Sequence, residues 1–393
     1  MSAAAGAGNS AARLVAILVA FLVFHLATSE MDSVLGYLFT PLTELVGMAA
    51  AVVLALGVAP AWRGHVVAAC LFMGGTLPIL VTFWDSTPQE DLARWIYWTF
   101  SARAAHVVAA PAFVLALLMA GDAFSERDRA KGFAVFPVAR SLAWAAAGGV
   151  TLYTGLVNQN FQDHTAVFRA TVAFLALACC VAFIARDDTA TDGKRGPVFV
   201  WDGARIRKEI EVLLRDWTFV RLFVAAVLVV ALSNTIARYR IPWETNLAAN
   251  MGDIFGRIVV KLLYPAAVLA GAFVADATRR KSEGAGIRVA MWAVLLSLPL
   301  FLVGIYSSSD GSIRIAFALA QAACGAIMAP VFAAAADRPA AGAKPLAIAA
   351  ISAIFILVPM LGFGDVVAAV LMKMFAVVST ADGKVNDRRF FGN

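Results

Sequence analysis

Charge is scarce in this sequence. Asp, Glu, Lys and Arg make up 15% of the 393 residues, whereas hydrophobic residues make up 61% and the mean hydropathy is +0.80. Soluble domains are about 25% charged and about 45–50% apolar. The composition therefore excludes an ordinary soluble domain and indicates a polytopic membrane protein. The net charge of +6 comes from basic residues in short, scattered loops, which argues against nucleic-acid binding.

The sequence also lacks the motifs of common enzymes and metal sites. It has no P-loop, no HExxH, no CxxC, and no GxGxxG after a strand. Its four cysteines lie in apolar segments without metal-ligand spacing, and its eleven methionines form no i, i+4 pair within a predicted helix. We therefore expect no enzymatic activity, no cofactor and no metal. A cleavable signal peptide is not expected either, because no A-x-A site follows the first apolar run.

Long apolar runs dominate what is present. They approach or exceed the roughly 20 residues that a membrane-spanning helix needs, and helix is expected because backbone polar groups must satisfy one another in lipid. The strict alternation of barrel strands is absent. The sequence thus predicts an all-α polytopic membrane protein. Its twelve predicted helices cover residues 13–29, 35–59, 66–84, 96–120, 132–155, 166–185, 219–237, 254–275, 287–306, 313–336, 345–361 and 364–380.

The distribution of Lys and Arg predicts the orientation. With the first residues placed inside, the inner loops and tails hold 22 Lys and Arg, and the outer loops and helix ends hold five. Inner loops are the basic ones in membrane proteins. We therefore expect both ends of the chain in the cytoplasm and the protein in the inner (plasma) membrane.

The chain divides into two halves. Residues 1–185 and 219–393 each hold six predicted helices, and matching loops recur after about 215 residues, as expected of a duplication. Residues 186–218 form a polar linker. Within it, apolar side chains from Ile206 to Trp217 share one helix face, which predicts an amphipathic helix on the inner membrane surface. A plain linker helix between the halves is an equal alternative.

Two loops carry a resemblance to a known family. AGAFVADATRRKSEG (270–284) and DAFSERDRAKG (122–132) resemble the loops after helices 8 and 4 of the major facilitator superfamily, and the six-plus-six arrangement with a long central loop is similar too. The loop after helix 2 departs from the family pattern and reads APAWRGH, and helix 5 keeps only Gly148-Gly149 of the antiporter motif. These departures argue against ordinary proton-driven drug efflux. The resemblance implies these gating-loop residues: Asp276, Arg279, Arg280, Arg127 and Arg129.

Basic residues inside predicted membrane helices point to a binding site, because such charges are costly unless they face protein or water. Arg140 and Lys261 lie far from the ends of their helices, and Arg103 and Arg257 lie in the outer halves of theirs. The resemblance implies that these helices line a central cavity. Arginine forks pair with carboxylate or phosphate oxygens, so we expect the four to bind an anion. For Arg257, an ion pair with Asp253 is an alternative.

Glu44 and His106 are candidates for proton coupling. Burial favours the neutral form of a carboxyl group, and imidazole titrates near physiological pH, so either group could load and release a proton. Structural roles are alternatives. Glu44 could pair with a buried arginine and lock two helices, His106 could be a helix contact, and Arg103 could extend to the membrane surface. His25 is a weaker candidate.

Three functions follow from these patterns. The first is a secondary active transporter that moves a small anionic organic solute by alternating access, as a proton symporter. The second is an exporter of hydrophobic or amphipathic compounds, for which the basic residues would be incidental. The third is a non-transporting membrane subunit that scaffolds a larger complex. A charged, water-accessible cavity would favour the first, an apolar cavity open to lipid the second, and a filled interface between the halves the third.

Overall fold

The computed structural model describes residues 2–35, 40–77, 92–157, 161–184, 197–245, 251–279, 285–307, 310–337 and 343–358. Within these ranges the chain is helical apart from short connecting turns and one isolated β-bridge. Two 3-10 turns, η1 (Pro60–Trp62) and η3 (Glu126–Asp128), join longer helices. The α-helices are α1 (Ser2–Leu35), α2 (Thr40–Gly57), α3 (Arg63–Thr76), α4 (Leu92–Ala123), α5 (Arg129–Val157), α6 (Phe161–Ile184), α7 (Gly203–Arg215), α8 (Trp217–Thr245), α9 (Met251–Arg279), α10 (Ala285–Tyr306), α11 (Asp310–Gly325), α12 (Met328–Asp337) and α13 (Lys344–Leu357).

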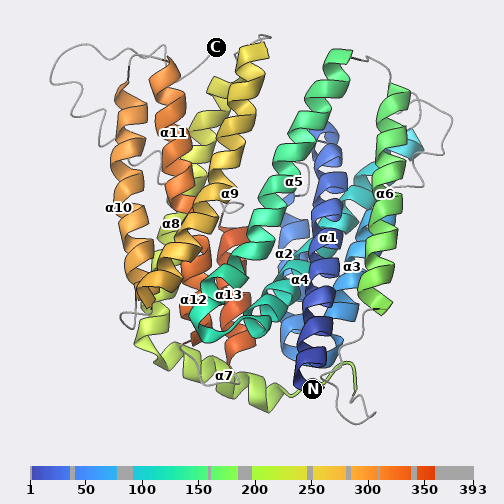
Figure 1. Cartoon of the computed structure of the whole chain (residues 1–393), viewed down its shortest axis with the longest axis vertical. Helices are drawn as coiled ribbons and strands as arrows, with labels where there is room; N and C mark the ends of the chain where they lie inside the picture. The colour runs from blue at the N-terminus through green and yellow to red at the C-terminus, as the bar shows by residue number, and fades with distance from the viewer. Residues whose placement is uncertain are drawn as a thin grey trace.

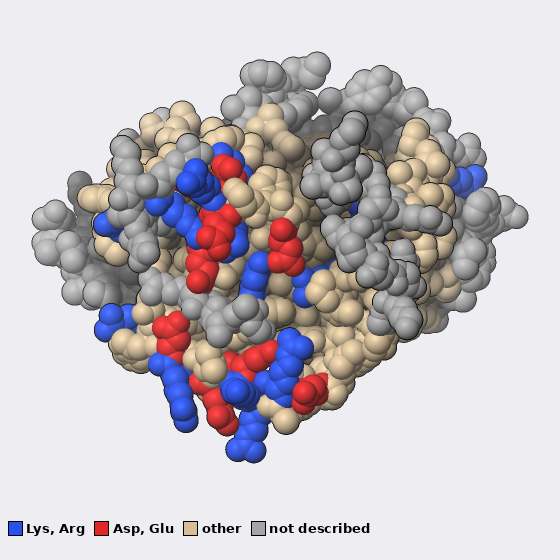
Figure 2. Space-filling model, turned by 60° about the horizontal axis from the view of Figure 1, so that its bottom comes forward, with Lys and Arg blue, Asp and Glu red and all other residues tan. Residues whose placement is uncertain are grey.

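The helices stand in two bundles side by side (Figure 1). Helices α1 to α6 form one bundle and α8 to α13 the other, and the bundles meet where α5 packs along α9 and α2 along α13. Helix α7 crosses their lower end. We call this end, which also carries η1 and η3, the linker face; the distribution of Lys and Arg predicts that it is cytoplasmic. Figure 2 shows acidic and basic side chains interspersed on this face.

The predicted apolar segments coincide with helices wherever the structure describes them. Most helices extend a few residues beyond the predicted limits, because polar residues at an end can stay helical outside the apolar core. The last predicted segment, 364–380, lies outside the described residues. Four stretches of the described chain are long and apolar enough to cross a membrane: Arg103–Ala123, Trp217–Thr235, Ile287–Gly304 and Ile315–Asp337.

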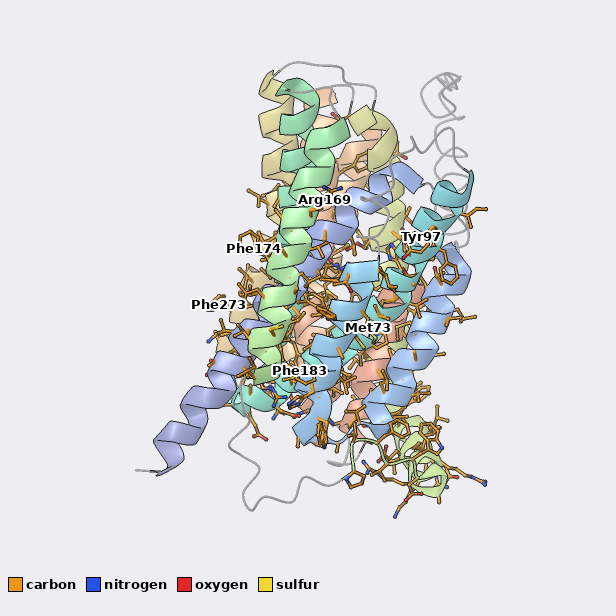
Figure 3. All side chains as sticks on the ribbon, turned by 90° about the vertical axis from the view of Figure 1, so that its right-hand side faces the viewer. Met73, Tyr97, Arg169, Phe174, Phe183 and Phe273 are labelled. Carbon is orange, nitrogen blue, oxygen red and sulfur yellow. The ribbon has the colours of Figure 1, made fainter. Side chains whose placement is uncertain are left out.

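The outer surface of the bundles is apolar. Phe174 and Phe183 on α6 and Phe273 on α9 are exposed, and Figure 3 shows them on the outside of the helices. Large exposed apolar side chains are unfavourable in water, whereas the hydrocarbon of a bilayer covers them. This surface and the long apolar helices indicate a multi-pass membrane protein.

The predicted helix 313–336 is broken in the structure. Helix α11 ends at Gly325, a two-residue turn follows, and α12 begins at Met328. Pro330 explains the break, because its ring conflicts with the carbonyl four residues earlier, at Ala326. That carbonyl lies where a side chain at Gly271 of α9 would be. The glycine therefore lets α9 approach the broken helix closely.

The linker is fixed to both bundles. Its first described residues pair with the end of α2, since the Val200 amide donates to the Gly57 carbonyl at 2.8 Å and the Ala59 amide to the Val198 carbonyl at 3.2 Å. The ring of Phe199 lies where a side chain at Gly57 would be. Helix α7 then begins with Asp202 as its N-cap and packs against α8 and α13. We call residues 197–201 the linker strand.

Candidate functional site

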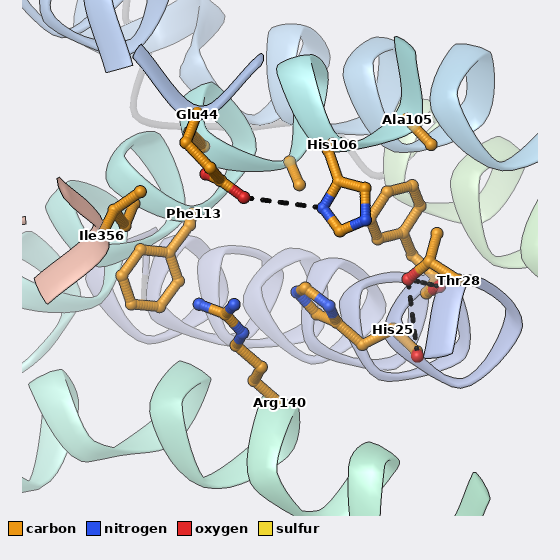
Figure 4. A pocket seen from close by; sticks show the side chains of 11 residues that line it. His25, Thr28, Glu44, Ala105, His106, Phe113, Arg140 and Ile356 are labelled. Carbon is orange, nitrogen blue, oxygen red and sulfur yellow. Dashed lines mark hydrogen bonds and ion pairs between the residues drawn. The ribbon is translucent and has the colours of Figure 1, made fainter. Parts of the chain in front are cut away.

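A polar cavity lies within the first bundle, between α1, α2, α4 and α5 (Figure 4). His25 and Thr28 reach it from α1, Glu44 from α2, His106 from α4 and Arg140 from α5. Its volume of about 30 Å³ is enough for one or two water molecules. The remaining lining residues are apolar: Phe24, Ala105, Ala109, Ala110, Phe113 and Ile356.

The secondary structure explains how these groups converge. Glu44 follows Pro41 in the first turns of α2, where proline is tolerated because its missing N–H is not needed. Arg140 comes one turn after Pro137 in α5. On α1, His25 and Thr28 are three residues apart and so share a face. The Thr28 hydroxyl donates to the Phe24 carbonyl at 3.0 Å, which leaves its oxygen able to accept a bond.

The charged groups of the cavity face one another. A Glu44 carboxylate oxygen (Oε1) lies 3.7 Å from Nδ1 of His106, and both side chains are largely buried. This distance is longer than a hydrogen bond and allows an ion pair when the histidine is protonated. Figure 4 shows the Arg140 guanidinium directed into the same space, beside Phe113 and the His25 ring. The cavity thus combines a guanidinium with one carboxyl group and two imidazole rings.

The structure brings together only part of the predicted anion site. Arg140 lines the cavity, but Arg103, one turn before His106 on α4, is not among its lining residues. Arg257 and Lys261 lie in α9, and their side chains fall outside the described residues, so their role stays a prediction. The predicted proton-coupling pair, Glu44 and His106, does meet in the cavity.

The sequence underestimated two contributors. His25 lies near the outer end of its apolar segment and is a weaker candidate from the sequence, yet it lines the cavity. Ile356 comes from α13 in the other bundle. No property of an isoleucine within an apolar run distinguishes it, so only the packing of the two bundles could reveal it.

A second group of charges joins the two bundles at the linker face. Asp122, at the end of α4, accepts from Nη1 of Arg63 at 2.9 Å and from Nζ of Lys344 at 2.5 Å. Arg63 belongs to the first bundle and Lys344 begins α13 of the second. Burial lowers the pKa of Arg63, and Asp122 opposes that change. We call these three residues the Asp122 hub.

A matching hub surrounds Asp337 at the end of α12. It pairs with Arg279 at the end of α9 and with Arg129 at the start of α5. Asp337 and Arg279 lie about 215 positions after Asp122 and Arg63, and Arg129 lies 215 positions before Lys344, as a duplicated fold predicts. Each hub therefore takes two residues from one bundle and one from the other. We call these residues the Asp337 hub.

Asp276 adds a contact that uses the backbone. Its two carboxylate oxygens accept from the N–H groups of Ala130 at 3.1 Å and Lys131 at 3.0 Å, in the first turn of α5. A carboxylate at a helix N-terminus is favourable because the free N–H groups there carry partial positive charge. Burial nevertheless raises the pKa of Asp276, and the two N–H bonds partly offset this effect.

Only some of the gating residues implied by the resemblance form contacts that the structure describes. Arg129 and Asp276 take part in contacts between the bundles, and Arg279 pairs with Asp337 within the second bundle. Arg127 is exposed and forms no ion pair within the part of the chain that the structure describes, and Arg280 lies outside that part. The sequence interpretation missed the roles of four residues: Arg63, Asp122, Asp337 and Lys344. Their constant spacing was the available signal.

Comparisons with known proteins give structural matches alone. No protein-family model and no curated protein matches the sequence. Among solved structures, the human organic anion transporter MFSD10 is 14% identical, with a TM-score of 0.64 over 90% of this chain and 93% of that one. The E. coli fucose:proton symporter FucP is 12% identical, with a TM-score of 0.58 over 94% and 92%. A bacterial homologue of the human lysosomal transporter Spinster is 11% identical, with a TM-score of 0.54 over 91% and 81%.

These matches cover nearly the whole chain, and a FucP structure among them is described as a major facilitator superfamily transporter. The predicted resemblance and the predicted all-α architecture are confirmed: over the residues that the structure describes, the chain has the fold of the major facilitator superfamily.

Proposed function

We propose that the protein is a secondary active transporter that moves a small organic anion by alternating access, together with protons. The observation that carries this proposal is the cavity in which Arg140, Glu44 and His106 meet. The fold supports transport as the general activity. The presence of a fixed cation in a cavity at membrane depth supports an anionic substrate, because such a charge is costly without a partner.

In this proposal Arg140 binds the anion, and Glu44 or His106 binds the proton. The Arg140 guanidinium would hold a carboxylate or phosphate group through two parallel N–H donors. Ionised Glu44 lines the same cavity and would compete with the substrate for that positive charge. A proton taken up by Glu44 or His106 removes the competing charge or adds a positive one. Anion and proton would therefore bind together, which is symport.

Transport also requires the cavity to change size. At about 30 Å³ it holds water and is too small for an organic anion, so the bundles must move apart to admit one. Ile356 of α13 closes the cavity on the side of the second bundle, and the two hubs hold the bundles together at the linker face. Rupture of the hubs would open the cavity toward that face.

The alternative functions receive less support. An exporter of hydrophobic compounds would need an apolar cavity, whereas this one carries an arginine, a glutamate and two histidines. A scaffold subunit would need no such cavity. The packing between bundles at the linker face, where Phe133 of α5 stacks on Phe332 of α12 with ring centroids 5.9 Å apart, is compatible with a closed gate.

Reconstituted vesicles provide the test. Organic carboxylates and phosphate esters would be screened by thermal stabilisation, and the best ligand would be measured in uptake and in counterflow. Arg140→Ala should lower affinity for it by about 2 kcal/mol, or roughly 30-fold, while Arg169→Ala, which removes an exposed arginine of α6, should not. Glu44→Gln should abolish uptake driven by a pH gradient and retain counterflow.

Two results would contradict the proposal. If Arg140→Ala binds and transports the anion as the unaltered protein does, the anion site lies elsewhere. If Glu44→Gln and the double variant Glu44→Gln/His106→Gln both keep uptake driven by a pH gradient, these groups do not couple protons to the anion.

A further inference from the structure

A second hollow, separate from the polar cavity, lies where the linker meets the second bundle. Helices α7, α8 and α13 enclose a groove of about 240 Å³. Leu213 and Leu214 contribute from α7, Phe219 and Phe223 from α8, and Ala350 from α13. Every residue that lines the groove is apolar. Such a space does not hold ordered water, which needs polar partners.

The groove lies at the level of a membrane surface. Its α8 residues occupy the first two turns of Trp217–Thr235, a stretch apolar enough to span a membrane. Its α13 residues, Leu346 and Ala350, occupy the first two turns of another apolar helix. Helix α7 crosses beneath these helix ends (Figure 1). This is the depth at which the headgroups of a bilayer meet its acyl chains.

One side of the groove is open. On α7, Leu213 is only 4% exposed because it faces the bundle, whereas Leu214 is 69% exposed. Trp217 at the start of α8 is also exposed, and tryptophan is enriched at the boundary between lipid and water. A hydrocarbon chain from the bilayer can enter an apolar groove that opens at this level.

The basic residues of α7 and of the start of α8, two of the helices that line the groove, divide into two groups. Arg205 and Arg207 on α7 are paired with the glutamates one turn later. Three others, Lys208, Arg215 and Arg221, are exposed and form no ion pair within the described ranges. The Arg221 guanidinium stacks over Trp217, 5.4 Å from its ring centroid, which holds this charge at the boundary. Unpaired basic groups there attract anionic headgroups.

We propose that this groove holds an acyl chain of an anionic phospholipid from the adjacent leaflet, with Arg215 and Arg221 binding its phosphate. The lipid would fasten α7 to α8 and α13. Lys344 begins α13 two residues before Leu346 of the groove, and it also pairs with Asp122 of the first bundle. An occupied groove would therefore stabilise the Asp122 hub and keep the linker face closed.

Retention of lipid by the purified protein tests the proposal without any transport assay. The protein would be delipidated in detergent and titrated with phosphatidylglycerol or phosphatidylcholine, and bound lipid would be counted by native mass spectrometry. We expect one phosphatidylglycerol to be retained in preference to phosphatidylcholine. Ala350→Phe should fill the groove and abolish this retention, while Leu228→Phe, at an exposed position further along α8, should keep it.

The charge of the groove rim provides a second set of variants. Arg215→Ala and Arg221→Ala should each weaken phosphatidylglycerol binding about fivefold, and Arg205→Ala, which removes a paired cation, should not. If Ala350→Phe does not fold, Leu214→Gln would replace it as the variant that should weaken lipid retention. The Leu214 side chain is largely exposed, so this position tolerates a polar group. Equal retention of phosphatidylglycerol by all variants, or equal retention of both lipids, would overturn the proposal.

Discussion

The two halves of the linker face match in their side-chain charges and differ in their backbone contacts. The Asp122 hub and the Asp337 hub contain equivalent residues at equivalent positions. Asp276, however, has no counterpart. Asp276 lies three positions before Arg279, and the residue three positions before Arg63 is Pro60. The residue that corresponds to Ala130, whose N–H group binds Asp276, is Pro345. The first half of the chain thus lacks the carboxylate, and the second half lacks the N–H group that it would bind.

The loop of the first half is held in another way. Residues 57–59 pair with the linker strand, and Phe199 covers Gly57. The Asp276 contact joins the two bundles and must break when they separate, whereas the linker strand joins a bundle to its own linker and need not. The comparison indicates that the linker face is asymmetric: one half holds its loop by a contact between the bundles, and the other by a contact within its own half.

The largest expected effect comes from removing the acid of a hub. Asp337 is 24% exposed and its two arginines are similarly shielded, whereas Asp122 is 48% exposed. Ion pairs that are better shielded from water contribute more. Asp337→Ala should therefore lower the free energy of unfolding by about 2 kcal/mol and Asp122→Ala by about 1 kcal/mol, as measured by thermal unfolding in detergent.

Cysteine labelling at the linker face would show whether the same variants open the gate. Labelling should increase more in Asp337→Ala than in Asp122→Ala. The opposite order would mean that the Asp122 hub is the stronger one, and the comparison drawn above would have to be reversed.

A smaller effect is expected from the contact that only one half has. Asp276→Ala removes two N–H acceptors at the start of α5 and should cost about 1–2 kcal/mol. Burial raises the pKa of Asp276, so the folded protein takes up this proton before the unfolded chain does. The contribution of Asp276 to folding is therefore least favourable above its folded pKa and improves as the pH falls through it.

Thermal unfolding between about pH 4 and about pH 7 would detect this dependence as a difference between variants. Asp276→Asn should remove this pH dependence. The stability of Asp276→Asn should therefore fall further below that of the unaltered protein as the pH falls. A deficit that is constant over this range would show that the folded protein does not protonate Asp276 early.

The smallest effect is expected from restoring the missing contact. Pro345→Ala returns an N–H group to the start of α13, and Pro60→Asp supplies a carboxylate at the position that corresponds to Asp276. The double variant should be stabilised by about 0.5–1 kcal/mol. Pro60→Asp alone should not be stabilised, because residue 345 would still be a proline without an N–H group to bind the new carboxylate. Equal stability of the single and double variants would show that the two loops are not equivalent in space.

The helices could be predicted from the sequence, because the length of an apolar run and the cost of an unsatisfied backbone in lipid decide them locally. The break before Pro330 was only partly foreseeable. A proline inside a membrane helix commonly produces a kink, but the sequence does not show that Gly271 of α9 approaches the Ala326 carbonyl at this break.

The site was predictable only where a residue stood out from its surroundings. Arg140, Glu44 and His106 are polar within apolar runs, and they share one cavity. Ile356 is an apolar residue among others, and its place in the lining depends on how α13 packs against α2. The hubs contain pairs of residues that are 208 and 222 positions apart, and no local pattern predicts such pairs.

Each hub contains one residue from the opposite bundle, and this arrangement affects how the boundary between the bundles tolerates substitutions. Since each hub borrows a cation from the opposite bundle, the two form parallel fastenings across the same boundary. When one hub is lost, the ion pair of the other still crosses this boundary. The Asp276 contact is thus an addition to two ion pairs that already join the bundles.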